Sequence, residues 1–355
     1  MVLPQVIALF HVLFNVIGVP GNLLVIVVIV LERRFHVMRY FLLASLAVSD
    51  MFCLILVNSF RIASIAKERW LYGQTMCVLN AFFARYFFLN TVLHLIAVSY
   101  ERYSAVVKSP LTYDGTITKS RVAFMALIWL VPIPICISPF LGWGKYSYNP
   151  DVFFCEQGWS VQSSSLAAVK SLFFVVVPFL VIAFLNCMVF KTVKTLQRND
   201  VAPVRVENTA CAGSENQSGQ EISRRIRERK AAVDISIIIA AFLLCCFSAW
   251  ITSLCRQLIT SFKMPAEVIL VTSCIFMSSF LCNPIIYSIR KREFRTGVKN
   301  VFRRIGICGS SNEIDVVANR ANPQVPDYPG RVGNGFSLRT TLRKARNCDT
   351  TTQDL

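Results

Sequence analysis

The chain has 355 residues, of which 54% are hydrophobic and only 16% are charged, and its mean hydropathy is +0.53. A soluble domain carries about 25% charged residues, so this composition argues against a water-soluble enzyme with one large core. A formal net charge of +17 would suggest nucleic acid as the partner of a soluble protein. Whether it does so here depends on where the charges lie relative to a membrane.

Seven long apolar segments follow one another along the chain, each long enough to cross a membrane, which takes about 20 residues. They are expected at residues 3–31, 40–65, 77–106, 122–140, 167–196, 233–258 and 266–289. Residues 291–304 are basic with apolar side chains at helical spacing, which predicts an amphipathic helix on the membrane surface. The polar segments at about 198–222 and at 306–355 are expected to be disordered.

These segments predict an all-α membrane protein: a seven-transmembrane helix bundle with a short amphipathic surface helix over residues 1–305, then a disordered cytoplasmic tail. Lys and Arg are concentrated in the first, third and fifth loops and after the seventh span. Because basic loops remain in the cytoplasm, the N-terminus is predicted to be extracellular and the C-terminus cytoplasmic, in the plasma membrane. The basic surface then faces anionic membrane lipid and a cytoplasmic partner, and nucleic acid is no longer needed to explain it.

This orientation assigns each of two polar clusters to one side of the membrane. Cys77 and Cys155 fall on the oxidising outer side, where a disulfide between them is expected. Glu101, Arg102 and Glu228 fall on the cytoplasmic side, where Arg102 can pair with Glu101 in its own helix or with Glu228 at the base of the sixth span. Breaking a pair between helices would free the sixth span to move, as a two-state switch requires.

Several motifs, in order along the chain, make it resemble the rhodopsin-like (class A) G-protein-coupled receptors over about residues 3–305. They are Gly21-Asn22, Leu46-Ala47-Val48-Ser49-Asp50, Cys77 with Glu101-Arg102-Tyr103, Trp129, Pro178 and Asn283-Pro284-Ile285-Ile286-Tyr287. The resemblance implies a receptor that transmits an extracellular small-molecule ligand to heterotrimeric G proteins, with Arg102 contacting the G protein. The residues expected to form the coupling switch are Glu101, Arg102, Tyr103, Glu228, Asn283, Pro284 and Tyr287.

The resemblance has further implications inside the membrane and at its cytoplasmic face. A water-filled pocket able to hold Na⁺ is expected from Asn22, Asp50, Thr91, Ser279 and Asn283. Cys308, just past the surface helix, is a candidate for palmitoylation or an unmodified thiol. The Ser and Thr residues of the tail are candidates for receptor kinases and arrestin, or simply a solvated segment.

Three residues depart from the family pattern. In the sixth span Cys246 stands where the family has Trp, and Ser248 stands where it has Pro. Without proline the sixth span has no obvious cause for a kink. In the fifth span Asn186 stands where the family has a Tyr that steadies the active state. Basal activity is therefore expected to differ from the family norm.

Two familiar ligand chemistries can be compared at matching positions. Amine receptors carry an Asp that pairs with the ammonium group, and the matching residue here is Ala84. Opsins carry a Lys that forms the retinal Schiff base, and the matching residue is Met277, so covalent retinal is excluded. An amine bound without the usual Asp remains an alternative.

Four basic residues fall in the outer halves of different spans: Arg61, Arg85, Lys170 and Arg256. No acidic residue is expected to be buried among them. Because unpaired cations are costly in a low-dielectric cavity, the hypothesis is a ligand with a carboxylate or phosphate. Together with Ala84, Cys246 and Met277, these residues make up the predicted ligand pocket. The alternative is that their side chains reach the outer interface or pair with loop acids, namely Glu68, Asp151, Glu156 and Glu267.

Other classes of protein fit less well. A transporter or channel would be favoured by inverted repeats or matching broken helices, and the sequence shows neither. An enzyme would need a converging nucleophile and base or metal ligands, which the isolated Asp50 does not supply, so no catalysis and no cofactor other than Na⁺ are predicted. His11 and His94 lie inside spans, either as pH sensors or as hydrogen-bonded core residues.

Overall fold

The computed structural model describes residues 2–108, 113, 115–158, 172–200, 240, 243–256, 264–290 and 292–304. The predictions for Lys170, Glu228, Cys308 and the tail from residue 306 lie outside these residues, as does the side chain of Tyr287. Six helices of the described part are long and apolar enough to cross a membrane, and a shorter apolar helix, Leu243–Arg256, lies where the sixth span was predicted.

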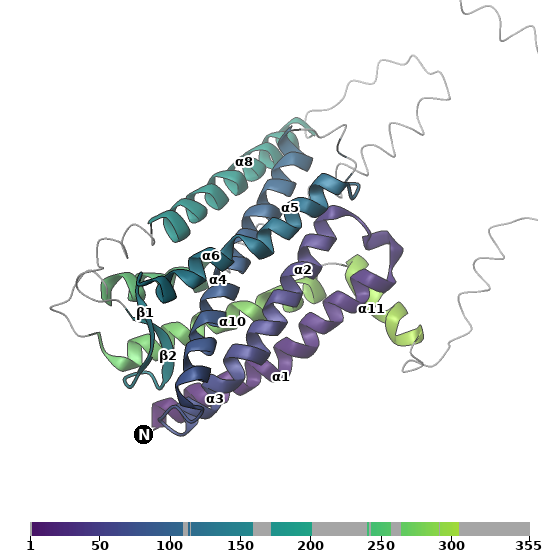
Figure 1. Ribbon diagram of the computed structural model, residues 1–355. Coiled ribbons are helices and arrows are strands. Elements are labelled where there is room, and N and C mark those ends of the chain that lie inside the picture. The colour runs from purple at the N-terminus through teal and green to yellow at the C-terminus, as the bar shows by residue number, and fades with distance from the viewer. Residues whose placement is uncertain are drawn as a thin grey trace, which may run out of the picture. The chain divides into compact units, whose positions relative to one another are not determined.

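The first half of the chain forms four of the spans (Figure 1). Their parts are α1 (Val2–Leu31), η1 (Arg33–Phe35), α2 (Met38–Cys53), the π-turn η2 (Leu54–Asn58), α3 (Ser59–Ala66), α4 (Gly73–Tyr103), the π-turn η3 (Ser104–Lys108), α5 (Lys119–Leu130), α6 (Pro132–Ile137) and η4 (Ser138–Leu141). The fourth span is divided between α5 and α6 because Pro132 has no backbone N–H to continue the helix.

The second half begins with a hairpin and continues with helices. Its parts are β1 (Lys145–Asn149), β2 (Phe154–Gly158), the π-turn η6 (Leu172–Val176), α8 (Val177–Asp200), the helix Leu243–Arg256, α10 (Ala266–Arg290) and α11 (Arg292–Arg304). Since α8 continues to Asp200, the segment expected to be disordered from about residue 198 begins in a helix. The amphipathic helix expected at 291–304 is present as α11, with Phe294 and Val301 buried.

The hairpin replaces what the sequence suggested was a polar loop. β1 and β2 pair antiparallel, with Tyr148 opposite Cys155. The side chain of Asn149 accepts a hydrogen bond from the backbone N–H of Asp151 at 3.0 Å, which closes the turn. Tyr146 is buried, and its hydroxyl donates to the backbone oxygen of Cys136 at 2.9 Å. This burial raises the pKa of Tyr146 and ties β1 to the end of the fourth span.

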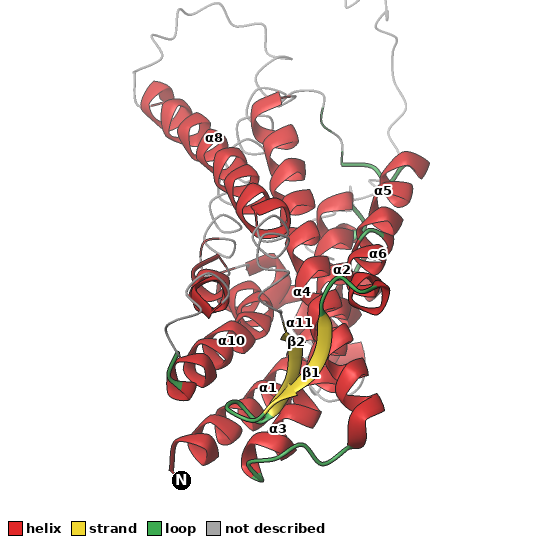
Figure 2. Ribbon diagram, turned by 60° about the vertical axis from the view of Figure 1, so that its left-hand side comes forward, coloured by secondary structure: helices red, strands yellow, loops and turns green. Residues whose placement is uncertain are grey.

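Figure 1 shows the hairpin and the N-terminus at one end of the bundle and α11 at the other, and Figure 2 shows the two paired strands from another side. We call the two ends of the bundle the hairpin end and the α11 end. α4 runs between them and contacts α2, α6, α8 and both strands, while α1 packs against α2, α3 and α10. One core cluster surrounds Leu95 and Val98 on α4, and a second joins α1, the second span and α10 near Leu54 and Phe280.

Polar side chains tie the helices together inside this core. Trp129 Nε1 donates to Ser45 Oγ at 2.9 Å, and the same hydroxyl shares a hydrogen bond of 2.8 Å with His94 Nε2. His11 shares a hydrogen bond with Asn58, whose own amide donates to the backbone oxygen of His11 at 3.0 Å. Both histidines therefore join helices. This agrees with the interpretation of His11 and His94 as hydrogen-bonded core residues.

Gly18 allows α1 to pack closely on its neighbours. A Cβ atom at this position would lie 2.5 Å from Leu54 Cδ1 and 2.8 Å from Leu281 Cδ2. We expect Gly18→Val to lower the free energy of unfolding by about 1–3 kcal/mol through overpacking, measured as a lower melting temperature of the purified protein. Val16→Ala, at a position 64% exposed on the same helix, should change it by less than about 0.5 kcal/mol. Equal melting temperatures for the two variants would contradict the prediction.

Candidate functional site

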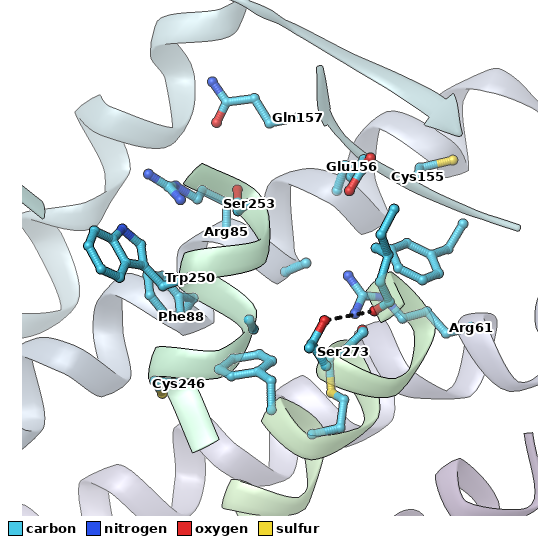
Figure 3. A pocket seen from close by; sticks show the side chains of 18 of the residues that line it. Arg61, Arg85, Phe88, Cys155, Glu156, Gln157, Cys246, Trp250, Ser253 and Ser273 are labelled. Carbon is cyan, nitrogen blue, oxygen red and sulfur yellow. Dashed lines mark hydrogen bonds between the residues drawn. The ribbon is translucent and has the colours of Figure 1, made fainter. Parts of the chain in front are cut away.

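A cavity of about 220 Å³ opens at the hairpin end of the bundle (Figure 3). α4, the helix Leu243–Arg256, α10 and β2 supply most of its wall. Six of the seven residues that the sequence placed in a ligand pocket line it, and Lys170 lies outside the described residues. The six are Arg61, Ala84, Arg85, Cys246, Arg256 and Met277.

An acidic residue also lines this cavity, contrary to the expectation that no acid lies among the cations. Glu156 on β2 forms a two-pronged ion pair with Arg256, with nitrogen–oxygen distances of 2.7 and 3.2 Å. Asn149 also donates to Glu156 Oε1 at 2.6 Å. The alternative that a loop acid pairs with one of the basic residues therefore holds for Arg256.

Aromatic side chains form another part of the wall, and no sequence pattern pointed to them. Phe88 and Phe276 meet edge to face, with ring centroids 5.7 Å apart. The guanidinium of Arg61, which is only 7% exposed, lies 4.3 Å from the centroid of the Phe154 ring. Trp250 also lines the cavity, and its Nε1 is buried without a hydrogen-bond partner among the described residues.

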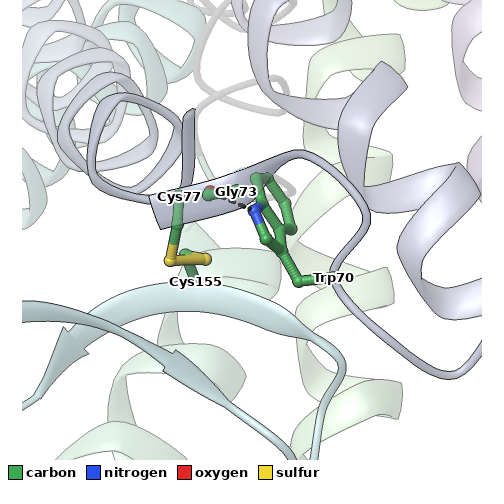
Figure 4. Close-up of a disulfide and its surroundings, with 4 residues drawn as sticks. All are labelled: Trp70, Gly73, Cys77 and Cys155. Atoms are coloured by element: carbon green, nitrogen blue, oxygen red, sulfur yellow. Dashed lines mark hydrogen bonds between the residues drawn. A yellow bond between two sulfur atoms is a disulfide. The ribbon is translucent and has the colours of Figure 1, made fainter. Parts of the chain in front are cut away.

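The disulfide expected between Cys77 and Cys155 is present (Figure 4). It joins the first turns of α4 to β2, and the two Cα atoms are 5.3 Å apart. Beside it, Trp70 Nε1 donates to the backbone oxygen of Gly73 at 2.7 Å, which steadies the start of α4. Because Glu156 follows Cys155 directly, the disulfide also positions this acidic side chain at the cavity.

The sixth span continues as a helix through the positions where the family motif is altered. Ser248 Oγ donates to the backbone oxygen of Cys245 at 2.9 Å, and Thr252 Oγ1 donates to that of Ser248 at 2.9 Å. Hydroxyl groups that bond back to the preceding turn can bend a helix without proline. Cys246 is 1% exposed and occupies the floor of the cavity.

Halfway along the bundle, buried polar groups gather around Asp50. Asn283 Nδ2 donates to Asp50 Oδ2 at 2.7 Å, while Asn22 Nδ2 donates to the backbone oxygen of Phe280 at 3.1 Å. Four buried oxygens of this region have no hydrogen-bond partner among the described residues: Asp50 Oδ1, Asn22 Oδ1, Thr91 Oγ1 and Ser49 Oγ. Ser279 is also buried, and its hydroxyl donates to the backbone oxygen of Phe276 at 2.6 Å.

At the α11 end of α4, Arg102 is 2% exposed and its Nε lies 3.8 Å from Glu101 Oε2. The hydroxyl of Tyr113 donates to Glu101 Oε1. Burial and the nearby Glu101 carboxylate raise the pKa of Tyr113, so it stays a proton donor. Tyr113 was missed from the sequence because it lies in a loop without a pattern. The pairing with Glu228 lies outside the described residues.

Tyr103, another predicted switch residue, and Asn186, a departure from the family pattern, contact side chains of neighbouring helices. Tyr103 packs beside Val106 and Val189. Asn186 on α8 donates to Ser99 Oγ on α4 at 3.0 Å, so the residue that replaces the family tyrosine joins the two helices in this structure.

These features describe a bundle of membrane-length helices with a cavity at the hairpin end and a buried arginine near the α11 end. The chain belongs to the 7 transmembrane receptor (rhodopsin family), whose sequence profile matches residues 21–287. Its fold is that of squid rhodopsin, with a TM-score of 0.73 at 18% sequence identity, covering 91% of this chain and 92% of the rhodopsin chain. The structure thus confirms a seven-helix fold of this family.

Among curated relatives, the chain is 29% identical to octopamine receptor beta-1R of Drosophila melanogaster, over 81% of this chain and 59% of that receptor. It is 28% identical to octopamine receptor beta-2R of Chilo suppressalis, over 81% and 77%. It is 27% identical to melanopsin of Felis catus, over 83% and 60%. The chain thus spans about three-fifths of the length of several receptors that it matches.

The disulfide should contribute strongly to stability, because it fixes the hairpin over the cavity. We expect Cys155→Ser to lower the free energy of unfolding by about 2–5 kcal/mol, measured as a lower melting temperature of the purified protein. Cys187→Ser, which replaces an exposed free cysteine on α8, is the matched control and should leave it nearly unchanged. Equal melting temperatures for Cys155→Ser and Cys187→Ser would show that the disulfide does not have this stabilising role.

Proposed function

We propose that the chain is a G-protein-coupled receptor of the plasma membrane that binds a small extracellular molecule in the cavity at the hairpin end. The observation that carries this proposal is the continuity of α4, which holds Arg85 on the cavity wall and Arg102 near its other end. At a rise of 1.5 Å per residue these two positions are about 25 Å apart. Ligand binding can therefore be linked to a G protein through one rigid element.

In this proposal the N-terminus and the hairpin face the outside, and Arg102 and α11 face the cytoplasm. The distribution of Lys and Arg among the loops supports this orientation. The chain acts as a receptor and carries out no catalysis of its own. Receptor kinases and arrestin acting on the tail, lipid contacts of α11 and palmitoylation of Cys308 belong to the same proposal.

An amine ligand is the second candidate. Relatives named for octopamine, adrenergic and 5-hydroxytryptamine ligands favour it. Within the described wall Glu156 is the one carboxylate that could receive an ammonium group, and Arg256 already binds both of its oxygens. Ala84 lines the cavity where the resemblance places the amine-binding acid. The charges of the described cavity therefore support an amine less well than a ligand without a positive charge.

The buried oxygens around Asp50 also support a Na⁺ site. Asp50 brings a negative charge, and the unpaired oxygens of Asp50, Asn22, Thr91 and Ser49 are the hard ligands that such a cation prefers. Asn283 holds the carboxylate in place from α10. A bound cation would offset the cost of burying this carboxylate.

The coupling function can be tested on the purified chain in lipid nanodiscs with a panel of heterotrimeric G proteins. We expect nucleotide exchange above the level of empty nanodiscs, and we expect Arg102→Ala to reduce it to background. Arg33→Ala, an exposed arginine near the same end, should leave exchange unchanged. Solute transport without exchange, or exchange that survives Arg102→Ala, would refute the proposal.

The Na⁺ site predicts a specific salt effect. Replacing KCl by NaCl at equal ionic strength should raise the melting temperature of the receptor, because a ligand at ten times its dissociation constant stabilises the folded state by about 1.4 kcal/mol. Asp50→Asn should abolish this difference, since it removes the charge that holds the ion. Asp151→Asn in the hairpin turn serves as the control and should retain it. A difference that persists in Asp50→Asn would place the ion elsewhere.

A further inference from the structure

Three donors on the cavity wall are buried without a hydrogen-bond partner among the described residues. They are Arg61 Nε, Arg85 Nε and Trp250 Nε1. Among the described wall residues, no unpaired buried side-chain atom is an acceptor. A buried donor left unpaired is destabilising, so a molecule that stabilises this cavity should bring acceptor atoms.

The three arginines of the wall differ in how their charge is compensated. Arg256 binds both oxygens of Glu156, and Arg61 stacks on Phe154 at 4.3 Å. Arg85 has a more distant ring contact, 5.8 Å from the centroid of Phe88, and no ion pair with a described residue. The charge of Arg85 is therefore the least satisfied of the three.

The chain segments next to two of the wall elements contain no acidic residue in their sequence. The residues that precede η6, 159–171, contain no Asp or Glu, and neither do residues 257–263, which follow the helix Leu243–Arg256. Both segments instead contain a lysine, Lys170 and Lys263. Three arginines and one glutamate are the charged residues of the described wall, so an entering ligand meets an excess of positive charge.

Figure 3 shows where an anion would find two donors together. The guanidinium of Arg85 and the indole of Trp250 lie at one end of the pocket, with Phe88 beside them, whereas Arg61 lies at the opposite end. An arginine and an indole N–H can share one carboxylate, since hydrogen bonds to an ionised acceptor are about twice as strong as neutral ones. The rings of Phe88 and Phe276 then provide an apolar wall for the rest of the ligand.

We propose that the cavity binds an aromatic carboxylate whose anionic group docks on Arg85 and Trp250, with its ring against Phe88 and Phe276. This inference rests on the proposed function, because it names the class of ligand that the receptor site takes. It also assigns separate roles to the arginines. Arg85 binds the ligand, while Arg256 and Glu156 hold the hairpin in place over it.

Three probes with one ring system but different charge test this proposal on the full chain in nanodiscs. They are indole-3-acetate, its neutral amide indole-3-acetamide, and the cation tryptamine. We expect indole-3-acetate to raise the melting temperature at concentrations about tenfold lower than the amide, which corresponds to about 1.4 kcal/mol, and tryptamine to have no effect. Equal shifts with all three probes, a preference for tryptamine, or no shift at all would overturn the proposal.

Variants of residues on the cavity wall test where the anionic group of the ligand binds. Arg85→Gln should remove the preference for the acid over the amide, and Arg85→Lys, which keeps the charge, should retain part of it. Trp250→Phe keeps an aromatic ring but loses the N–H together with part of the ring area, so the preference should fall by about threefold. Lys145→Gln, at an exposed basic residue of β1 outside the cavity wall, is the matched control and should keep the preference. If Arg61→Gln removes the preference and Arg85→Gln does not, the assignment is wrong.

A second measurement separates a binding role from a structural one. Without ligand, Arg85→Gln should melt no lower than the wild type, since it removes an uncompensated buried charge. A clear loss of stability would mean that Arg85 supports the fold. Nucleotide exchange is recorded on the same samples: acid-selective binding without exchange would refute only the receptor proposal, and exchange without acid selectivity would refute only this inference.

Discussion

One continuous helix is the constraint on which the rest of the structure depends. α4 carries the disulfide cysteine Cys77, the cavity residue Arg85, the polar residue Thr91 and the buried Arg102 along a single axis. Inside a membrane every backbone polar group must be satisfied within the protein, and an unbroken helix achieves this over its whole length. The same rigidity fixes the spacing between the cavity and the opposite end, so a change at one end can alter packing at the other.

Polar contacts hold the other spans around this helix. In lipid the hydrophobic effect contributes little to helix association, and close packing and hydrogen bonds take its place. Ser45, His94 and Trp129 join the second, third and fourth spans, while Asn186 joins the fifth span to the third. Such contacts specify which helices pack together, whereas a uniformly apolar surface does not. The core histidines His11 and His94 take part in this framework through their hydrogen bonds.

Much of the fold could be predicted from hydropathy, because a membrane span imposes a length and a composition that local sequence reveals. The hairpin could not, since Tyr146 and Tyr148 become a strand only when β2 pairs with them and the disulfide holds both over α4. The motif residues Asp50 and Asn283 could be paired in advance through the family resemblance. Their hydrogen bond is nevertheless a long-range contact that spacing alone does not reveal.

The cavity shows the same division between local and long-range information. The basic residues on its wall were visible as charges inside apolar segments, where charge is costly and noticeable. Glu156 and Tyr113 looked like ordinary loop residues, and only folding brings one to Arg256 and the other to Glu101. No motif in the sequence pointed to Trp250, and its N–H, unpaired among the described residues, becomes meaningful only when the cavity is known.

Charge placement on α4 connects these observations to ligand choice. The resemblance places the acid of amine receptors at Ala84, and the next residue on the same helix is Arg85. The described cavity therefore lacks a carboxylate at that position and has a cation beside it. Since Arg256 already binds the carboxylate that β2 brings in, the cavity retains positive charge and unpaired donors. In the proposed ligand site, the three arginines and one glutamate of the described wall would favour an anion, although relatives of this chain are named for amines.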